Sequence, residues 1–357
     1  MNLSLLHALP LPDFTLKNRV VMAPVTRSRS NAEGVLPDYA AEFYAQRADA
    51  GLLITEATNI SPQAKGDEFT PGIWSESQIA AWRKVTEAVH ARDGRIFMQL
   101  WHTGRVSHAS LQPDGKAPVS ASAIQANGQA FVGNGFKPYS EPRALELDEI
   151  AAVIADYRQA AENAKCAGFD GVEVHSANNY LLEQFIRDST NQRSDRYGGS
   201  LENRLRFPLE VIRAVVDVWG AKRVGVRISP LTEYPGGTPR DGQIMATYGQ
   251  YIDAMNSMGL LYLHMIEGNG ASAPGVDMLA LRQRFTGVYI ANDGYDLPKA
   301  EAAIASQHAD LISFGKLFIA NPDLVKRFAC GGPFADSPAQ YFYGGGTLGY
   351  TDWPCLK

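Results

Sequence analysis

The sequence is poor in cysteine, and its cysteines are not spaced for metal binding. Of the 357 residues only three are cysteine, Cys166, Cys330 and Cys355, and none of them forms a CxxC pair. Zinc sites need closely spaced ligands, and the small domains that depend on disulfides need an even framework of cysteines. We therefore expect no metal site and a reducing, cytoplasmic location.

Long apolar runs and a strong excess of one charge are also lacking. No uncharged run approaches the length of a membrane span, and residues 1–7 have neither the basic region nor the long apolar core of a secretory signal. The formal net charge of -5 at pH 7 argues against nucleic acid or an anionic membrane as the main partner. The expected partner is therefore a small molecule, and the sequence does not indicate an oligomeric state.

What the sequence contains is a regular alternation of apolar, strand-like runs with amphipathic helical runs. The expected strands lie at about 19–22, 52–56, 95–100, 171–174, 224–228, 261–265, 288–291 and 310–314. Helices are expected between them, with Ser75 and Ser200 as N-caps and a capping box from Ser75 to Gln78. A stretch rich in Gly, Pro, Ser and Asn, at about 103–143, is an insertion, because the alternation resumes unchanged behind it.

Eight strand–helix units without a change in composition predict an α/β fold. The expected architecture is a single (β/α)8 TIM barrel over residues 1–357, with an inserted loop or hairpin region after strand three. A doubly wound open sheet is the alternative. It would carry a glycine-rich dinucleotide turn after its first strand, and Ala-Pro-Val-Thr at 23–26 is not such a turn.

The stretch at 171–185 is the first candidate for a site. A buried strand ends there in His175, Asn178 and Tyr180, and parallel α/β folds place their chemistry at the carboxyl ends of strands. One such residue alone would more often only cap a loop. Three polar side chains directly after one strand favour a site.

In a barrel, the other strand ends would meet these residues around one mouth. Several of them have uncharged hydrogen-bonding side chains, and the set has one arginine on a buried strand and no pair of acids. The residues are Pro24, Thr26, Ala57, Gln99, Trp101, Arg227, those at 292–295, Gly315 and Lys316. Such a set suits a planar heterocycle rich in carbonyls. It does not suit a glycosidase, which needs two carboxylates, or a metal hydrolase. Glycines follow strands seven and eight, whose loops frequently bind a phosphate in this fold.

Seven short motifs occur in a fixed order along the chain. They are Met-Ala-Pro-Val-Thr-Arg at 22–27, Gln-Leu-Trp-His-Thr-Gly-Arg at 99–105, His-Ser-Ala-Asn-Asn-Tyr at 175–180, Tyr-Gly-Gly-Ser-Leu-Glu-Asn-Arg at 197–204, Val-Arg-Ile-Ser-Pro at 226–230, Asn-Pro-Asp at 321–323 and Tyr-Thr-Asp-Trp-Pro at 350–354. Together they resemble the old yellow enzyme family of FMN-dependent ene-reductases. The match runs from about residue 14 to 354, and the bacterial branch with the pentaerythritol tetranitrate and N-ethylmaleimide reductases is the nearest.

The resemblance implies a noncovalently bound FMN at the barrel mouth, reduced by NADPH or NADH. Thr26 would hydrogen-bond the flavin O4 and tune its potential, which places it among the catalytic residues. Gln99 and Arg227 would hold the pyrimidine edge. The full set of implied cofactor-binding residues is Ala23, Pro24, Val25, Thr26, Ala57, Gln99, His175, Arg227, Asp293, Gly294, Tyr295, Gly315 and Lys316.

The resemblance also implies the reaction. A hydride would pass from flavin N5 to the β-carbon of an activated alkene such as an enone, a maleimide or a nitroalkene, with nitrate esters as a further substrate class. His175 and Asn178 would hydrogen-bond the substrate oxygen as charge develops on it. Tyr180 would protonate the α-carbon, and Trp101 and Tyr343 would line the substrate pocket.

Four residues depart from the family pattern. Asn179 stands where the family often has glycine, and we expect the turn to survive because asparagine tolerates left-handed dihedrals. Asp67 stands where close relatives carry a pocket tyrosine. Asp293 replaces a small residue before the phosphate loop, and Lys316 replaces an arginine.

Two other functions stay open at this point. One is a cofactor-free lyase that uses Lys316 as its Schiff-base residue, and the other is a flavin-binding protein without turnover. The sequence does not indicate the physiological substrate or a preference between NADPH and NADH.

Overall fold

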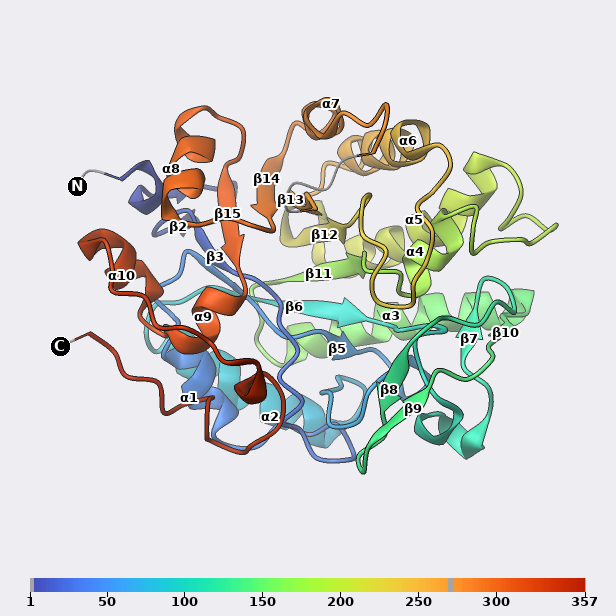
Figure 1. Cartoon of the computed structure of the whole chain (residues 1–357), viewed down its shortest axis with the longest axis horizontal. Helices are drawn as coiled ribbons and strands as arrows, with labels where there is room; N and C mark the ends of the chain where they lie inside the picture. The colour runs from blue at the N-terminus through green and yellow to red at the C-terminus, as the bar shows by residue number, and fades with distance from the viewer. Residues whose placement is uncertain (1–2, 269–272, 357) are drawn as a thin grey trace.

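Eight short parallel strands form a closed barrel at the centre of the molecule (Figure 1). The computed structural model describes residues 3–268 and 273–356. The barrel strands are β3 (Val20–Met22), β4 (Leu52–Ile54), β6 (Ile96–Trp101), β11 (Gly171–Ser176), β12 (Val224–Ile228), β13 (Tyr262–Ile266), β14 (Val288–Asn292) and β15 (Leu311–Phe314). Strand β11 pairs with β12 on one side and with β6 on the other, which closes the barrel. The predicted TIM barrel is confirmed.

The helices surround the barrel and alternate with its strands (Figure 1). They are α1 (Ala40–Ala45), α2 (Glu76–His90), α3 (Leu147–Cys166), α4 (Leu181–Ile186), α5 (Leu201–Trp219), α6 (Ile244–Ser257), α7 (Met278–Gln283), α8 (Leu297–Ala305), α9 (Lys316–Ala320) and α10 (Leu324–Cys330). Both predicted N-caps are confirmed, because Ser75 forms a capping box with Gln78 and Ser200 accepts the backbone N–H of Asn203. None of the helices in the described ranges is long and apolar enough to cross a membrane.

An apolar core fills one end of the barrel interior. It includes Val21, Leu52, Phe97 and Ile290 from four of the strands. The N-terminal hairpin of β1 (Leu9–Pro10) and β2 (Thr15–Leu16) packs Leu16 against this core. Since the hairpin covers that end, the barrel is open to ligands at the carboxyl ends of its strands.

The insertion after β6 has a small core of its own. Strands β8 (Gln129–Phe131) and β9 (Phe136–Pro138) form an antiparallel hairpin, and β7 (Val119–Ser120) pairs with β10 (Arg143–Ala144). Five buried apolar residues of the insertion pack together, among them Val106, Ala130 and Tyr139, and Val132 and Tyr180 pack against them. The insertion therefore builds one wall around Tyr180, beside the end of β11.

Candidate active site

A hydrogen-bonded network of buried side chains crosses the barrel above its apolar floor. Gln99 Nε2 donates to Glu173 Oε1 at 2.7 Å, and Glu173 Oε2 lies 2.8 Å from His264 Nδ1. His264 Nε2 in turn lies 2.8 Å from Ser313 Oγ. Burial alone would raise the pKa of Glu173, but His264, Arg227 and Gln99 hold that pKa below its usual value. Glu173 is therefore a carboxylate, and it fixes the amide group of Gln99.

Arg227 and Gln99 keep free hydrogen-bonding atoms at the mouth. Arg227 is only 7% exposed; its Nη2 donates to Asn292 Oδ1 at 2.8 Å, while its Nε has no partner among the described residues. Because the carboxylate of Glu173 can only accept, the amide nitrogen of Gln99 faces it, and no described residue donates a hydrogen bond to its carbonyl oxygen. An unpaired buried donor is costly. This pair therefore suits a ligand edge that carries both carbonyl and N–H groups.

His175 lies at the end of β11 as a neutral imidazole. It is 3% exposed, and burial lowers its pKa well below the usual value, with Arg227 and His264 adding to the effect. The backbone N–H of Ala177 donates to Nδ1 at 3.3 Å. The proton therefore lies on Nε2, which leaves His175 as an uncharged hydrogen-bond donor.

The turn after His175 depends on two asparagines in left-handed backbone conformations. The φ angles are 55° for Asn178 and 58° for Asn179. The N–H of Asn178 donates to Ser229 Oγ at 2.7 Å, and that of Asn179 donates to Glu183 Oε2 at 2.6 Å. The expectation that asparagine would preserve the turn at 179 is confirmed.

Tyr180 lies between two other rings of the site. Its ring makes edge-on contacts with Trp101 at 5.0 Å and with His175 at 5.1 Å between centroids. Burial raises the pKa of Tyr180 well above its usual value, and the charge of Asp67 adds to the effect. Tyr180 is therefore a neutral phenol at any physiological pH, and its ring lies edge-on to that of His175.

The segment that carries Tyr343 is held down by arginines next to Thr26. Arg27 donates through Nη2 to the carbonyl oxygens of Tyr341 and Gly349, each at 2.9 Å. The backbone N–H of Arg27 donates to Glu56 Oε2 at 3.0 Å. Thr26 and Tyr343 are thus tied to the same buried cluster, although Tyr343 itself is 63% exposed.

The remaining predicted residues at β3 and β4 lie at the same end of the barrel. The N–H of Ala23 donates to the carbonyl oxygen of Phe314 at 3.1 Å, so the chain continues through Pro24 and Val25 across the mouth. Pro24 and Val25 are partly exposed there, and Ala57 is buried behind them.

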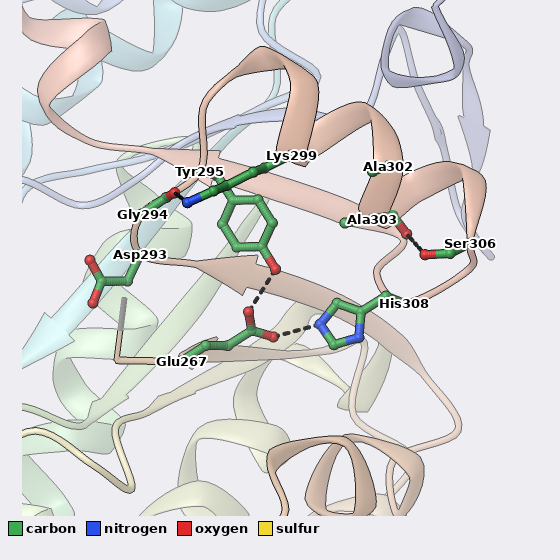
Figure 2. A pocket seen from close by; sticks show the side chains of 9 residues that line it. All are labelled: Glu267, Asp293, Gly294, Tyr295, Lys299, Ala302, Ala303, Ser306 and His308. Carbon is green, nitrogen blue, oxygen red and sulfur yellow. Dashed lines mark hydrogen bonds and ion pairs between the residues drawn. The ribbon is translucent and has the colours of Figure 1, made fainter. Parts of the chain in front are cut away.

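The loops after β14 and β15 carry the predicted phosphate site. A Cβ added to Gly315 would lie 3.2 Å from Val25 Cγ1, so little more than a glycine fits at this position. Lys316 is exposed and makes no ion pair within the described chain. Asp293 is also exposed and has a φ of 89°, a value that glycine adopts most easily. Tyr295 directs its phenol toward Glu267 and His308, and Asp293 lies on the other side of the loop (Figure 2).

Several residues of this region were not predicted from the sequence. The polar network residues Glu173, His264 and Ser313 were missed, as were Tyr139 and Tyr234, whose phenols lie near that of Tyr180. For Glu173 the sequence did contain an indication, because this glutamate lies inside an apolar strand, two residues before His175. Residues two apart on a strand share a face, so Glu173 had to point into the barrel with His175.

These features define a class of protein: a parallel barrel whose mouth binds a planar heterocycle with a phosphate tail. The FMN isoalloxazine ring and phosphate fit the free donors and acceptor of Arg227 and Gln99 and the loop at Gly315. A sequence model of the NADH:flavin oxidoreductase / NADH oxidase family matches residues 4–333. The chain belongs to this family.

Three relatives show how far the similarity extends. The chain is 45% identical over 350 residues to 12-oxophytodienoate reductase 1 of Oryza sativa subsp. japonica, with 96% of this chain and 90% of that protein covered. The structure of morphinone reductase in complex with tetrahydroNAD matches with a TM-score of 0.94 and 47% identity, over 100% of this chain and 98% of that one. An old yellow enzyme homologue from Zymomonas mobilis matches with a TM-score of 0.94 and 41% identity, over 99% and 100%.

The resemblance to the old yellow enzymes is thereby confirmed. The expected activity, an FMN-dependent reduction of activated C=C bonds with electrons from a nicotinamide, is also confirmed.

Proposed function

We propose that the protein reduces small activated alkenes at this mouth, with His175 and Asn178 binding the activating oxygen and Tyr180 supplying the proton. The observation that carries the proposal is the edge-on contact of the His175 and Tyr180 rings at the end of β11, 5.1 Å between centroids, with Asn178 in the turn between them. All three are uncharged or held neutral by burial. Neutral donors bind a ground-state carbonyl weakly and an oxygen that gains negative charge more strongly, as transition-state stabilisation requires.

His175 acts as a donor and not as an acid. Its Nε2–H is fixed by the Ala177 N–H at Nδ1, and the nearby charge of Arg227 opposes a second proton on the ring. Asn178 extends from the same turn, so the two side chains bind one oxygen together. Tyr180 stands beside them and holds a phenolic proton that it delivers to the α-carbon.

The cofactor would be held by residues at the ends of six strands. Thr26 and the partly exposed Pro24 and Val25 border the ring, Gln99 and Arg227 bind its pyrimidine edge, and backbone N–H groups near Gly294 and Gly315 bind the phosphate. FMN, when bound, supplies the hydride that it receives from the nicotinamide. Lys316 adds a positive charge next to the phosphate, and Ala57, Asp293 and Tyr295 complete the surroundings.

The lyase alternative is not supported. A Schiff-base lysine needs an apolar or cationic environment that favours its neutral form. Lys316 is exposed at the start of α9, so nothing around it removes water from the ammonium group.

We also propose that the whole chain acts as one cytoplasmic flavin oxidoreductase domain that needs no nucleic-acid partner. The three cysteines are exposed free thiols, which supports a reducing compartment.

Transient kinetics of Tyr180→Phe test the function. Reduction of the bound flavin by NADPH should proceed at nearly the wild-type rate, whereas reoxidation by 2-cyclohexenone should slow, because only that half-reaction needs the proton. Tyr251→Phe is a matched control, since this buried phenol lies 3.0 Å from Ser176 Oγ on the opposite face of β11. Equal slowing of both half-reactions, or no cyclohexanone from the wild-type protein, would contradict the proposal.

A further inference from the structure

A carboxylate lies in the wall that encloses Tyr180. Asp67 follows β5 (Thr58–Asn59) and a short 3-10 turn, and its Oδ1 accepts the N–H of Phe131 in β8 at 2.7 Å. Val132, the next residue of that hairpin, packs with Tyr180 against the apolar core of the insertion. Asp67 is thus fixed to the wall that the insertion forms beside Tyr180.

No cation neutralises this carboxylate. Within the described residues, no lysine, arginine or histidine lies within ion-pair distance of Asp67. The nearest lysine in sequence, Lys65, pairs with Glu68 at 2.7 Å. Burial raises the pKa of Asp67, and the N–H of Phe131 opposes this by binding the ionised form. The negative charge that remains acts on whatever fills the space in front of it.

The charge of Asp67 reaches phenols from three separate parts of the chain. Burial is the main cause of the raised pKa of Tyr180, Tyr139 and Tyr343, and the charge of Asp67 raises each of the three further. Tyr180 follows β11, Tyr139 belongs to the insertion, and Tyr343 lies in the C-terminal segment. Together with the hydrogen bond to Phe131, these effects place the carboxylate of Asp67 beside Tyr180, on the side of the β8–β9 hairpin.

We infer that Asp67 is a specificity-determining residue, which makes the enzyme favour alkenes with a cationic substituent and discriminate against alkenes with an anionic one. The inference rests on the proposed function, because it assigns the charge of the substrate that the same pocket accepts. Two charges a few ångströms apart near a protein surface interact by a few kcal/mol before screening, so a preference of about tenfold is expected.

The test uses three cinnamaldehydes: the parent compound and its para-carboxylate and para-trimethylammonium derivatives. The measured quantity is kcat/KM for the cation divided by kcat/KM for the anion, in wild type and in Asp67→Asn. Comparing each compound between two proteins cancels differences in intrinsic reactivity. Asparagine keeps an oxygen for the N–H of Phe131 and removes only the charge. Glu68→Gln is the matched control, since it removes a neighbouring carboxylate that Lys65 already neutralises.

We expect Asp67→Asn to lower the ratio about tenfold and Glu68→Gln to leave it within about twofold. In the wild-type protein, raising the salt concentration from about 0.02 M to about 0.5 M should shrink the ratio, because salt screens exposed charges. This second measurement decides the matter if Asp67→Asn does not fold. A ratio that neither the substitution nor salt changes would overturn the role of Asp67. Failure of the wild-type protein to reduce the uncharged compound would instead overturn the proposed function.

Discussion

We expect Glu56→Gln to remove a pH dependence of stability that the wild-type protein shows between about pH 4.5 and about pH 7. Glu56 is 1% exposed. Its Oε2 accepts the N–H of Arg27 at 3.0 Å, and its Oε1 lies 3.5 Å from the hydroxyl of Tyr44. Burial raises the pKa of Glu56 from 4.5 to about 7, although the Arg27 N–H, the charges of Arg27 and Arg29, and Tyr44 all oppose this rise.

The sign follows from the number of protons that each state binds. Between pH 4.5 and about pH 7 the folded protein keeps the Glu56 proton and the unfolded chain has lost it, so the free energy of unfolding falls as the pH rises. The stabilisation is fully present below pH 4.5 and is lost by about pH 7. The pKa of Glu56 is raised by about 2.5 pH units on folding, which corresponds to a change of about 3 kcal/mol in the free energy of unfolding at 1.36 kcal/mol per pH unit.

The assay is equilibrium urea unfolding at several pH values, with FMN in excess and tryptophan fluorescence as the signal. All other titrating groups are common to both proteins, so the difference between wild type and Glu56→Gln isolates this carboxyl. We expect that difference to change by about 2.5 kcal/mol between about pH 5 and about pH 8. Glu267→Gln should change in the opposite sense and only below pH 4.5, because hydrogen bonds from His308, Tyr289 and Tyr295 outweigh burial and lower the pKa of Glu267. A constant difference across this range would refute the reasoning for Glu56.

Three further predictions concern the ligands. Replacing both His175 and Asn178 by alanine should weaken the binding of phenolate ligands, because each hydrogen bond to a charged oxygen contributes roughly 1.5–3 kcal/mol. The affinity is measured from the long-wavelength charge-transfer band of the bound phenolate. An unchanged affinity would exclude both residues from the site. Lys316→Ala should raise the FMN dissociation constant, measured by flavin fluorescence, with little effect on the rate of the loaded enzyme. Asp293→Gly should lower the FMN dissociation constant modestly, since it removes a repulsive charge and relaxes a φ of 89°. If Lys316→Ala bound FMN more tightly than the wild type and Asp293→Gly bound it less tightly, the assigned phosphate site would be contradicted.

The barrel was predictable because each of its strands is a short, nearly continuous apolar run. Parallel strands covered by helices are buried on both faces, so their sequences show no polar alternation. The caps at Ser75 and Ser200 were predictable for a local reason, since a cap depends only on residues within one helical turn. The β8–β9 hairpin was not resolved within the insertion, because its core forms only when Val106 and Tyr139, more than thirty positions apart, pack together.

The site was predictable where one strand end supplies it. His175, Asn178 and Tyr180 are close in sequence, so their proximity needs no knowledge of the fold. Asp67 was noted as a departure, but its exposure to the pocket depends on the path of the β8–β9 hairpin, which the sequence does not specify. Glu56 was seen only as the end of a strand, because its burial depends on Tyr44 and on the C-terminal segment.

The distribution of charge in the site has a consequence for its pH dependence. The ionised groups Glu173 and Arg227 are held by hydrogen bonds, and the groups that bind the substrate oxygen or protonate the substrate are neutral. The positive charge of Arg227 helps to keep His175 neutral, so the imidazole does not change its charge between pH 6 and pH 8. Tyr180 does not do so either, since its pKa lies well above 10. Near neutrality the carboxyl that titrates next to the flavin site is Glu56, with a pKa of about 7. Because Glu56 binds the N–H of Arg27, the residue after Thr26, its titration would act on the environment of Thr26 and not on the donors that bind the substrate.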